Sequence, residues 1–262
     1  METVTSEDGT KIAYDKQGQG PALILVTGAT MTRGSYAELA QLLAPDYTVY
    51  YYDRRGRGDS TDTKPFSVEK EVDDIEAIID KAGGSAFVYG ISSGACLAML
   101  AASRLGDKVT KLALYEAPYD ESDGAAEKWK QYRTNLDKAI AEDRRGDAVV
   151  LFMKLVGVPE QMITGMQHSP MWPGLEAVAP TLCYDAAAMG ADRSVPVDDA
   201  AHVHAQTLVI DGGASLESLP FMRPTAEKLA KAIPHAKRHT IEGQSHDISS
   251  EALAPVLNEF FS

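Results

Sequence analysis

The sequence predicts an α/β fold in which a mostly parallel central sheet is flanked by helices. Short apolar runs typical of buried strands alternate with amphipathic stretches typical of helices over residues 21–118 and again over 206–262. Between these two parts, residues 119–195 contain helical patterns and turns but no clear strand. We therefore expect one sheet domain that carries a helical insertion late in its sequence.

The first part of the chain supplies most of the expected elements. Residues 2–16 alternate around a Glu-Asp-Gly turn, which predicts a hairpin. Continuous apolar or β-branched runs predict buried strands at residues 21–30, 47–53, 85–90 and 109–118. Apolar residues at helical spacing, with proline or glycine stop signals, predict helices at residues 35–45, 68–83 and 93–107.

The alternation returns near the end of the chain. Strands are expected at residues 206–213 and 237–243, and helices at 223–233 and from about 249. We therefore divide the chain into a core formed by residues 1–118 and 196–262 and a helical insertion formed by residues 119–195.

Composition and charge exclude several classes of protein. Apolar residues make up 44% of the 262 residues, so a sizeable core is expected. The formal net charge of −13 argues against nucleic acid or an anionic membrane as a partner, because both require a basic surface. Two cysteines, Cys96 and Cys183, indicate neither a disulfide framework nor a metal site. Without a signal-peptide pattern or a membrane-length apolar run, we expect a cytoplasmic protein, and a homodimer stays open.

Residues 88–95, VYGISSGA, lie between an expected strand and an expected helix rich in small residues. In that context the spacing Gly90-x-Ser92-x-Gly94 is typical of a nucleophile elbow, a sharp turn that exposes a serine hydroxyl at the carboxyl end of a sheet. A Cβ at either glycine would meet the neighbouring strand or helix. Ser92 alone is flanked symmetrically by glycines and is the candidate nucleophile. The backbone N–H of the following Ser93 is a candidate oxyanion donor.

Two further segments complete a resemblance to a known family. The run LVTGAT ends an expected buried strand in Thr27, Gly28 and Ala29, and the run DRRGRGDS has the form D-x-R-G-x-G-x-S. Together with the elbow, these segments resemble the α/β-hydrolase superfamily, and the insertion lies where that family carries its cap. The resemblance covers residues 2–118 and 205–262.

The resemblance implies an α/β-hydrolase fold with a helical cap. It also implies that the backbone N–H of Ala29 is the second oxyanion donor. The family usually has histidine where this chain has Thr27, a departure that matters little because the donor is a backbone group. In relatives the D-x-R-G-x-G-x-S loop is structural, and we interpret Asp53 and Arg55 in the same way.

Among the six histidines, His246 has the position that a catalytic base requires. It lies in the run IEGQSHDIS, after the last expected strand and before the last helix. A loop at the carboxyl edge of the sheet can bring an imidazole over the elbow serine, and the superfamily keeps its catalytic histidine in this loop. We therefore expect His246 to be the general base.

The third member of the predicted triad is where the sequence departs from the family. The usual acid lies three residues after Gly212, where this chain has Ser215, which cannot stabilise an imidazolium by charge. Three carboxylates are candidates in its place: Asp211, Glu217 and Glu116. Certain haloalkane dehalogenases carry their acid at the earlier strand end, and the run YEAP resembles that arrangement. Glu116 is therefore the favoured candidate, with Asp211 next.

A serine nucleophile predicts acyl transfer through an acyl-enzyme, with no cofactor and no metal. Methionine and aromatic residues in the insertion indicate an apolar pocket, and the candidate substrate contacts are Trp129, Met153, Met166 and Trp172. We expect a serine hydrolase for a medium-sized hydrophobic ester, thioester or lactone. The alternatives are a carbon–carbon bond hydrolase, a cofactor-free perhydrolase with the same triad, and a non-catalytic small-molecule binding protein.

Overall fold

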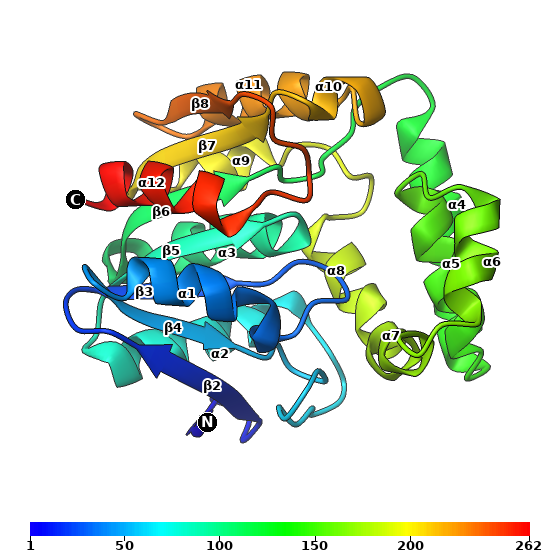
Figure 1. Cartoon of the computed structure of the whole chain (residues 1–262), viewed down its shortest axis with the longest axis horizontal. Coiled ribbons are helices and arrows are strands. Elements are labelled where there is room, and N and C mark those ends of the chain that lie inside the picture. Colours follow the sequence, from blue (N-terminus) through cyan, green and yellow to red (C-terminus); the bar gives the residue numbers. More distant parts are fainter.

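An eight-stranded sheet with helices on both faces forms the centre of the computed structural model, which describes residues 1–262 (Figure 1). The strands lie in the order β1-β2-β4-β3-β5-β6-β7-β8. Neighbours from β4 to β8 are parallel, whereas β1 and β2, and β2 and β4, are antiparallel. The predicted fold class is therefore confirmed. The strands are β1 (Glu2–Thr5), β2 (Lys11–Gln17), β3 (Ala22–Val26), β4 (Thr48–Tyr52), β5 (Ala86–Ile91), β6 (Val109–Tyr115), β7 (Gln206–Gly212) and β8 (Lys237–Ile241).

Each strand and helix expected outside the insertion is present, with ends that differ by a few residues. The helices of this part are α1 (Ala37–Leu43), α2 (Val68–Ala82), α3 (Ser93–Leu105), α9 (Val197–Ala201), α10 (Ser215–Ser218), α11 (Met222–Ala232) and α12 (Ser250–Phe261). The short helices α9 and α10 were not predicted, because four or five residues are too few to show a helical period. None of the helices combines the length and the apolar character needed to cross a membrane.

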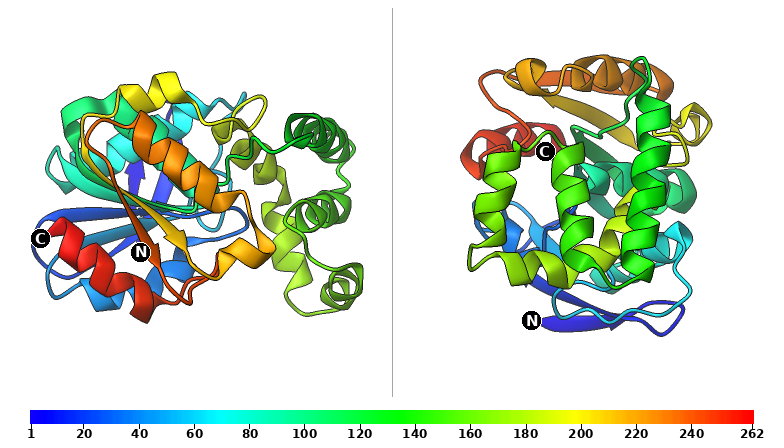
Figure 2. Two further views of the ribbon diagram at one scale, coloured as in Figure 1. Left: turned by 90° about the horizontal axis from the view of Figure 1, so that it is seen from above. Right: turned by 90° about the vertical axis from the view of Figure 1, so that its right-hand side faces the viewer.

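The two faces of the sheet are covered by different helices. On one face α1 contacts α12, and Leu39, Leu43 and Phe261 belong to the apolar cluster between these helices and the sheet. On the other face α2 contacts α3, and α11 contacts β7 (Figure 2, left). The larger apolar cluster on this second face also includes Leu136 and Val149 of the insertion, so the insertion and the core share one hydrophobic interior.

The insertion, residues 119–195, forms α-helices and no strand. These helices are α4 (Ala125–Ala141), α5 (Arg145–Leu155), α6 (Glu160–Gln167), α7 (Trp172–Val178) and α8 (Leu182–Ala188). Helices α4 to α7 stand beside the sheet as a group, and α8 lies between that group and the core (Figure 1; Figure 2, left). Because α8 contacts α3, the insertion comes close to the end of the sheet where the elbow lies.

Candidate active site

The turn between β5 and α3 holds Ser92 in a strained conformation. Its φ is 56° and its ψ is −130°, a region that costs a non-glycine residue roughly 1–3 kcal/mol. A Cβ added to Gly90 would lie 2.4 Å from the carbonyl oxygen of Gly94, and one added to Gly94 would lie 2.5 Å from that of Thr27. Both glycines are therefore required by the close approach of α3 to β5 and to the end of β3.

The segments that carry the two candidate oxyanion donors, Ser93 and Ala29, both lie next to Ser92. Ser93 is the first residue of α3, and the first N–H groups of a helix have no acceptor within it. At the end of β3, a Cβ added to Gly28 would lie 3.1 Å from the Cβ of Ser92, so the Gly28–Ala29 segment runs directly beside the serine. Thr30 has a φ of 61°, which turns the chain away immediately afterwards. Ser93 and Ala29 are thus placed as the two candidate oxyanion donors.

His246 pairs with Glu116. The Nδ1 of His246 lies 2.7 Å from the Oε2 of Glu116, whose side chain is completely buried, whereas the His246 side chain is 31% exposed. This pairing leaves Nε2 as the ring atom available for proton transfer. No hydrogen bond joins the ring to the hydroxyl of Ser92. In substrate-free enzymes that contact is often long and tightens only when substrate binds.

The end of β6 positions both Glu116 and the loop that carries His246. Glu116 has a φ of 45°, and its Oε1 accepts a 2.9 Å hydrogen bond from the N–H of Gly212. The hydroxyl of the preceding Tyr115 donates to the carbonyl oxygen of Ser245 at 2.5 Å. The N–H of Ser92 donates to the carbonyl oxygen of Tyr115 at 2.9 Å. Tyr115 therefore ties the elbow to the His246 loop, a role that the sequence analysis missed because a tyrosine in a buried strand has no distinguishing pattern.

Of the three carboxylates considered for the triad, only Glu116 contacts His246. Asp211 is 1% exposed and accepts hydrogen bonds from Arg238 at 2.6 Å and from Thr240 at 3.1 Å. Glu217 is exposed on the short helix α10. The hydroxyl of Ser215, at the usual position of the acid, is buried and has no hydrogen-bond partner.

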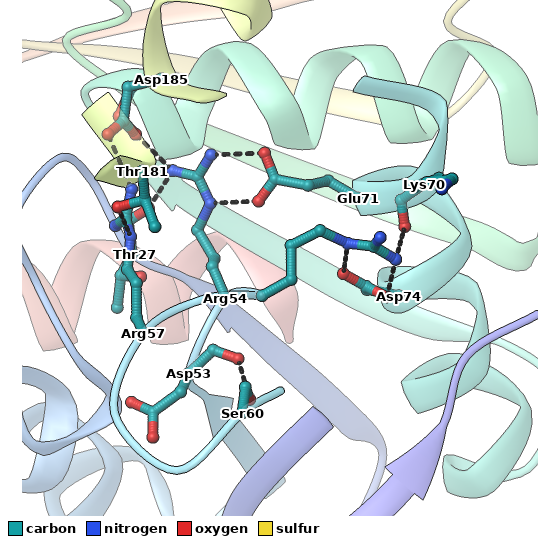
Figure 3. A network of polar contacts seen from close by, with 12 residues as sticks. Thr27, Asp53, Arg54, Arg57, Ser60, Lys70, Glu71, Asp74, Thr181 and Asp185 are labelled. Carbon is teal, nitrogen blue, oxygen red and sulfur yellow. Dashed lines mark hydrogen bonds and ion pairs between the residues drawn. The ribbon is translucent and has the colours of Figure 1, made fainter. Parts of the chain in front are cut away.

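A buried ion-pair network lies behind the elbow (Figure 3). Arg54 makes two 2.7 Å hydrogen bonds to Glu71 of α2 and one of 2.6 Å to Asp185 of α8. Arg57 donates to the other oxygen of Asp185 at 2.7 Å. None of the four residues is more than 2% exposed, so every charge needs a partner of opposite sign.

The sequence analysis missed the two arginines of this network because they occupy variable positions of the D-x-R-G-x-G-x-S loop. Asp185 did carry a signal, as the one charged residue in the otherwise uncharged stretch LCYDAAAMG. The residues interpreted as structural do make structural contacts. Asp53 accepts from the backbone N–H of Arg33 at 2.7 Å, and Arg55 makes two 2.8 Å hydrogen bonds to Asp74.

Comparison with known proteins agrees with the geometry. The model of the alpha/beta hydrolase family matches residues 23–258. The chain belongs to the alpha/beta hydrolase family. The solved structure of an alpha/beta hydrolase from Sphaerobacter thermophilus is 51% identical, covers 100% of both chains and superposes with a TM-score of 0.90. A hydrolase structure from Pseudomonas aeruginosa, 19% identical with a TM-score of 0.75 over 100% of this chain and 98% of that one, shares the fold.

Curated relatives of this alpha/beta hydrolase match over a shorter stretch. The pimeloyl-[acyl-carrier protein] methyl ester esterase of Photobacterium profundum is 33% identical over 103 residues, which is 39% of each chain. The uncharacterized hydrolase YraK of Bacillus subtilis is 35% identical over 95 residues, which is 35% of each chain. The matches thus span less than two fifths of either relative's length.

The residues of the insertion that were expected to contact substrate contribute to the packing of the insertion itself. Trp129 is 0% exposed, and its indole N–H donates to the carbonyl oxygen of Gly190 at 3.0 Å. Its ring therefore lines no surface open to solvent, so the structure does not place it against a substrate. Met153 and Trp172 are 5% and 8% exposed in the same apolar cluster, and Met166 is only partly buried against it.

A surface groove of about 560 Å³ lies away from the elbow. Its lining includes Lys111, Gln206 and Lys237, near the starts of β6, β7 and β8, whereas Ser92 follows the end of β5. The groove is therefore at the opposite edge of the sheet. No group of three or more histidine, cysteine or acidic side chains is arranged to hold a metal ion.

Proposed function

We propose that this protein is a serine hydrolase that cleaves a medium-sized hydrophobic ester, thioester or lactone through an acyl-enzyme intermediate. The observation that carries the proposal is the 2.7 Å pairing of His246 Nδ1 with the buried Glu116, at the sheet edge where Ser92 occupies a strained elbow. A buried carboxylate on the inner nitrogen of an imidazole fixes its tautomer and stabilises the imidazolium that forms when serine attacks.

The residues divide the reaction between them. The hydroxyl oxygen of Ser92 attacks the substrate carbonyl carbon, and Nε2 of His246 takes the hydroxyl proton. The N–H groups of Ala29 and Ser93 stabilise the resulting oxyanion. Collapse of the tetrahedral intermediate expels the alcohol or thiol, which receives the proton from His246. A water molecule, deprotonated by His246, then attacks the acyl carbon, and the acid and free Ser92 are released.

Two observations support an apolar ester as the substrate class. Phe152, Met166 and Leu175 of the cap are only partly buried, so the cap keeps apolar surface that an acyl chain can cover. The Photobacterium relative is a methyl ester esterase, which favours an ester over other acyl compounds.

The proposal is tested with p-nitrophenyl esters of increasing acyl length and with a fluorophosphonate probe. We expect turnover to rise from acetate to a medium-length acyl chain, and we expect intact-mass and peptide mapping to locate the probe on Ser92. Ser92→Ala should lower kcat by roughly 10⁴-fold or more and abolish labelling. The matched variant Ser93→Ala, which keeps the backbone N–H, should keep labelling and lose at most about tenfold.

Comparable losses in the two serine variants would overturn the assignment of Ser92. A folded wild-type protein that neither hydrolyses any ester of the series nor reacts with the probe would contradict the enzymatic function and indicate a binding protein.

A further inference from the structure

We propose that Asp185, on cap helix α8, is a positioning residue that holds both halves of the oxyanion hole in place. The inference rests on the proposed function, since it concerns the two N–H groups that would bind the oxyanion. Asp185 itself does not reach the reacting atoms. It acts through Arg57 on one side and through Ser93 on the other.

The first half of the hole is fixed through the peptide that joins Gly28 to Ala29. The carbonyl oxygen of Gly28 accepts a 2.6 Å hydrogen bond from Nη1 of Arg57. The C=O of Gly28 and the N–H of Ala29 belong to one planar trans peptide, so they point in opposite directions. Because Arg57 fixes the direction of this carbonyl, it also fixes the direction in which the Ala29 N–H points. A charged donor on the carbonyl also polarises that N–H and strengthens it as a donor.

The guanidinium of Arg57 is in turn held by the cap. Its Nη2 donates to Oδ2 of Asp185 at 2.7 Å, and its Nε donates to the hydroxyl of Thr181 at 2.9 Å (Figure 3). Thr181 lies immediately before α8. The beginning and the body of one cap helix therefore determine where Arg57 donates.

The second half of the hole is fixed through the side chain of Ser93. Its hydroxyl donates to Oδ1 of Asp185 at 2.7 Å, and Ser93 is 1% exposed. Oδ1 also accepts from Nη1 of Arg54, which lies 3.3 Å from the carbonyl oxygen of Thr27. One carboxylate thus contacts the residue of one oxyanion donor directly and the peptide of the other through an arginine.

The charge of Asp185 is required for this arrangement. Burial alone would raise the pKa of its carboxyl group, but the charges of Arg57 and Arg54 and the Ser93 hydroxyl hold the pKa below its ordinary value. Together with Glu71, the two arginines and Asp185 balance at two positive and two negative charges. Replacing Asp185 by a neutral residue leaves one buried positive charge without a partner, so the arginines are expected to move.

The test compares isosteric substitutions of two buried carboxylates that belong to separate groups of ion pairs. Asp185→Asn removes the carboxylate that faces the oxyanion hole. Asp74→Asn removes an equally buried carboxylate, 1% exposed, from Arg55, which contacts no carbonyl of the oxyanion segment. Each variant is assayed with p-nitrophenyl butyrate and with an alkyl trifluoromethyl ketone, which adds to a catalytic serine and places a negatively charged oxygen in the hole. Urea unfolding supplies the stability of each variant.

We expect Asp185→Asn to lower kcat by roughly 10- to 100-fold with KM within about threefold, less than the loss from deleting a donor outright. Affinity for the trifluoromethyl ketone should fall by the same factor as kcat/KM. Asp74→Asn should lose stability but keep kcat within about threefold, because it leaves the oxyanion peptides in place. Equal kcat losses in the two variants, or wild-type kcat in Asp185→Asn, would overturn the positioning role.

Ser93→Ala keeps the inference testable if Asp185→Asn yields too little folded protein. It removes only the hydroxyl that reaches Asp185, and we expect it to lower kcat by about three- to tenfold without a change in KM. Wild-type kcat in this variant would also overturn the proposal. Wild-type protein without esterase activity would contradict the proposed function itself, whereas equal activity in wild type and Asp185→Asn would contradict the role of Asp185 alone.

Discussion

Glu116 and Asp211 are two buried carboxylates at the ends of neighbouring parallel strands, and they have different partners. Glu116 follows β6 and pairs with His246 at 2.7 Å. Asp211, near the end of β7, faces Arg238 at 2.6 Å and Arg223 at 3.5 Å. Their exposures of 3% and 1% are almost the same, so burial does not distinguish them.

The backbone conformation explains why the two carboxylates have different partners. Glu116 has left strand geometry, with a φ of 45°, and its side chain turns across the end of β7 to the His246 loop. Asp211 is still within β7 and is registered opposite Thr240 of β8, so its side chain lies on a face of the sheet beside that strand. Glu116, which lies just beyond its strand, therefore reaches the His246 loop. Asp211, which lies within its strand, instead pairs with arginines beside the sheet.

Removing His246 should produce the largest effect and shows whether Glu116 acts through it. His246→Ala should lower kcat for p-nitrophenyl butyrate by roughly 10⁴-fold or more, because no base then takes the serine proton. Adding Glu116→Gln to His246→Ala should cause little further loss, since the two residues act as a unit. A further large loss in the double variant would contradict that coupling.

Glu116→Gln, as a single substitution, tests whether Glu116 is the acid of the triad. We expect kcat to fall roughly 10²- to 10⁴-fold, because an amide that donates to Nδ1 holds the imidazole in the wrong tautomer. Circular dichroism should show a retained fold. A kcat close to that of the wild type would remove Glu116 from the triad.

Asp211→Asn tests whether Asp211 has a structural role only. We expect kcat within about tenfold of wild type, and a decrease of about 1–3 kcal/mol in the free energy of unfolding in urea, because Arg238 and Arg223 lose a buried charged acceptor. If Asp211→Asn abolishes activity while Glu116→Gln leaves it intact, the two assignments are reversed.

Glu217→Gln should have the smallest effect. Glu217 is exposed on α10, two residues after the usual acid position. We expect kcat to stay within about twofold of wild type and the free energy of unfolding to change by less than about 0.5 kcal/mol in the same assays. A tenfold loss of kcat would show that the loop after β7 moves toward His246 during turnover.

The sequence by itself determined the sheet, the elbow and the position of the histidine, because each can be recognised from residues that are close together in the chain or from the order of the strands. Alternating strand and helix patterns reflect burial of one face or both faces of an element, and Gly90 and Gly94 reflect a close approach at a single turn. His246 was placed by its order after the last strand. The early end of β6 was not predicted, because nothing in the residue type at Glu116 indicates a positive φ.

Only the tertiary structure decided between the three candidate carboxylates and brought Asp185 to the elbow. Asp211, Glu217 and Glu116 have the same chemistry, and their partners depend on which loops meet at the sheet edge. Arg57 and Asp185 are 128 residues apart in the chain, and their contact requires that the insertion return to the sheet at α8. Buried charges of opposite sign must be paired, and the partners can lie far apart in the sequence. A local sequence pattern therefore cannot predict which residues will pair.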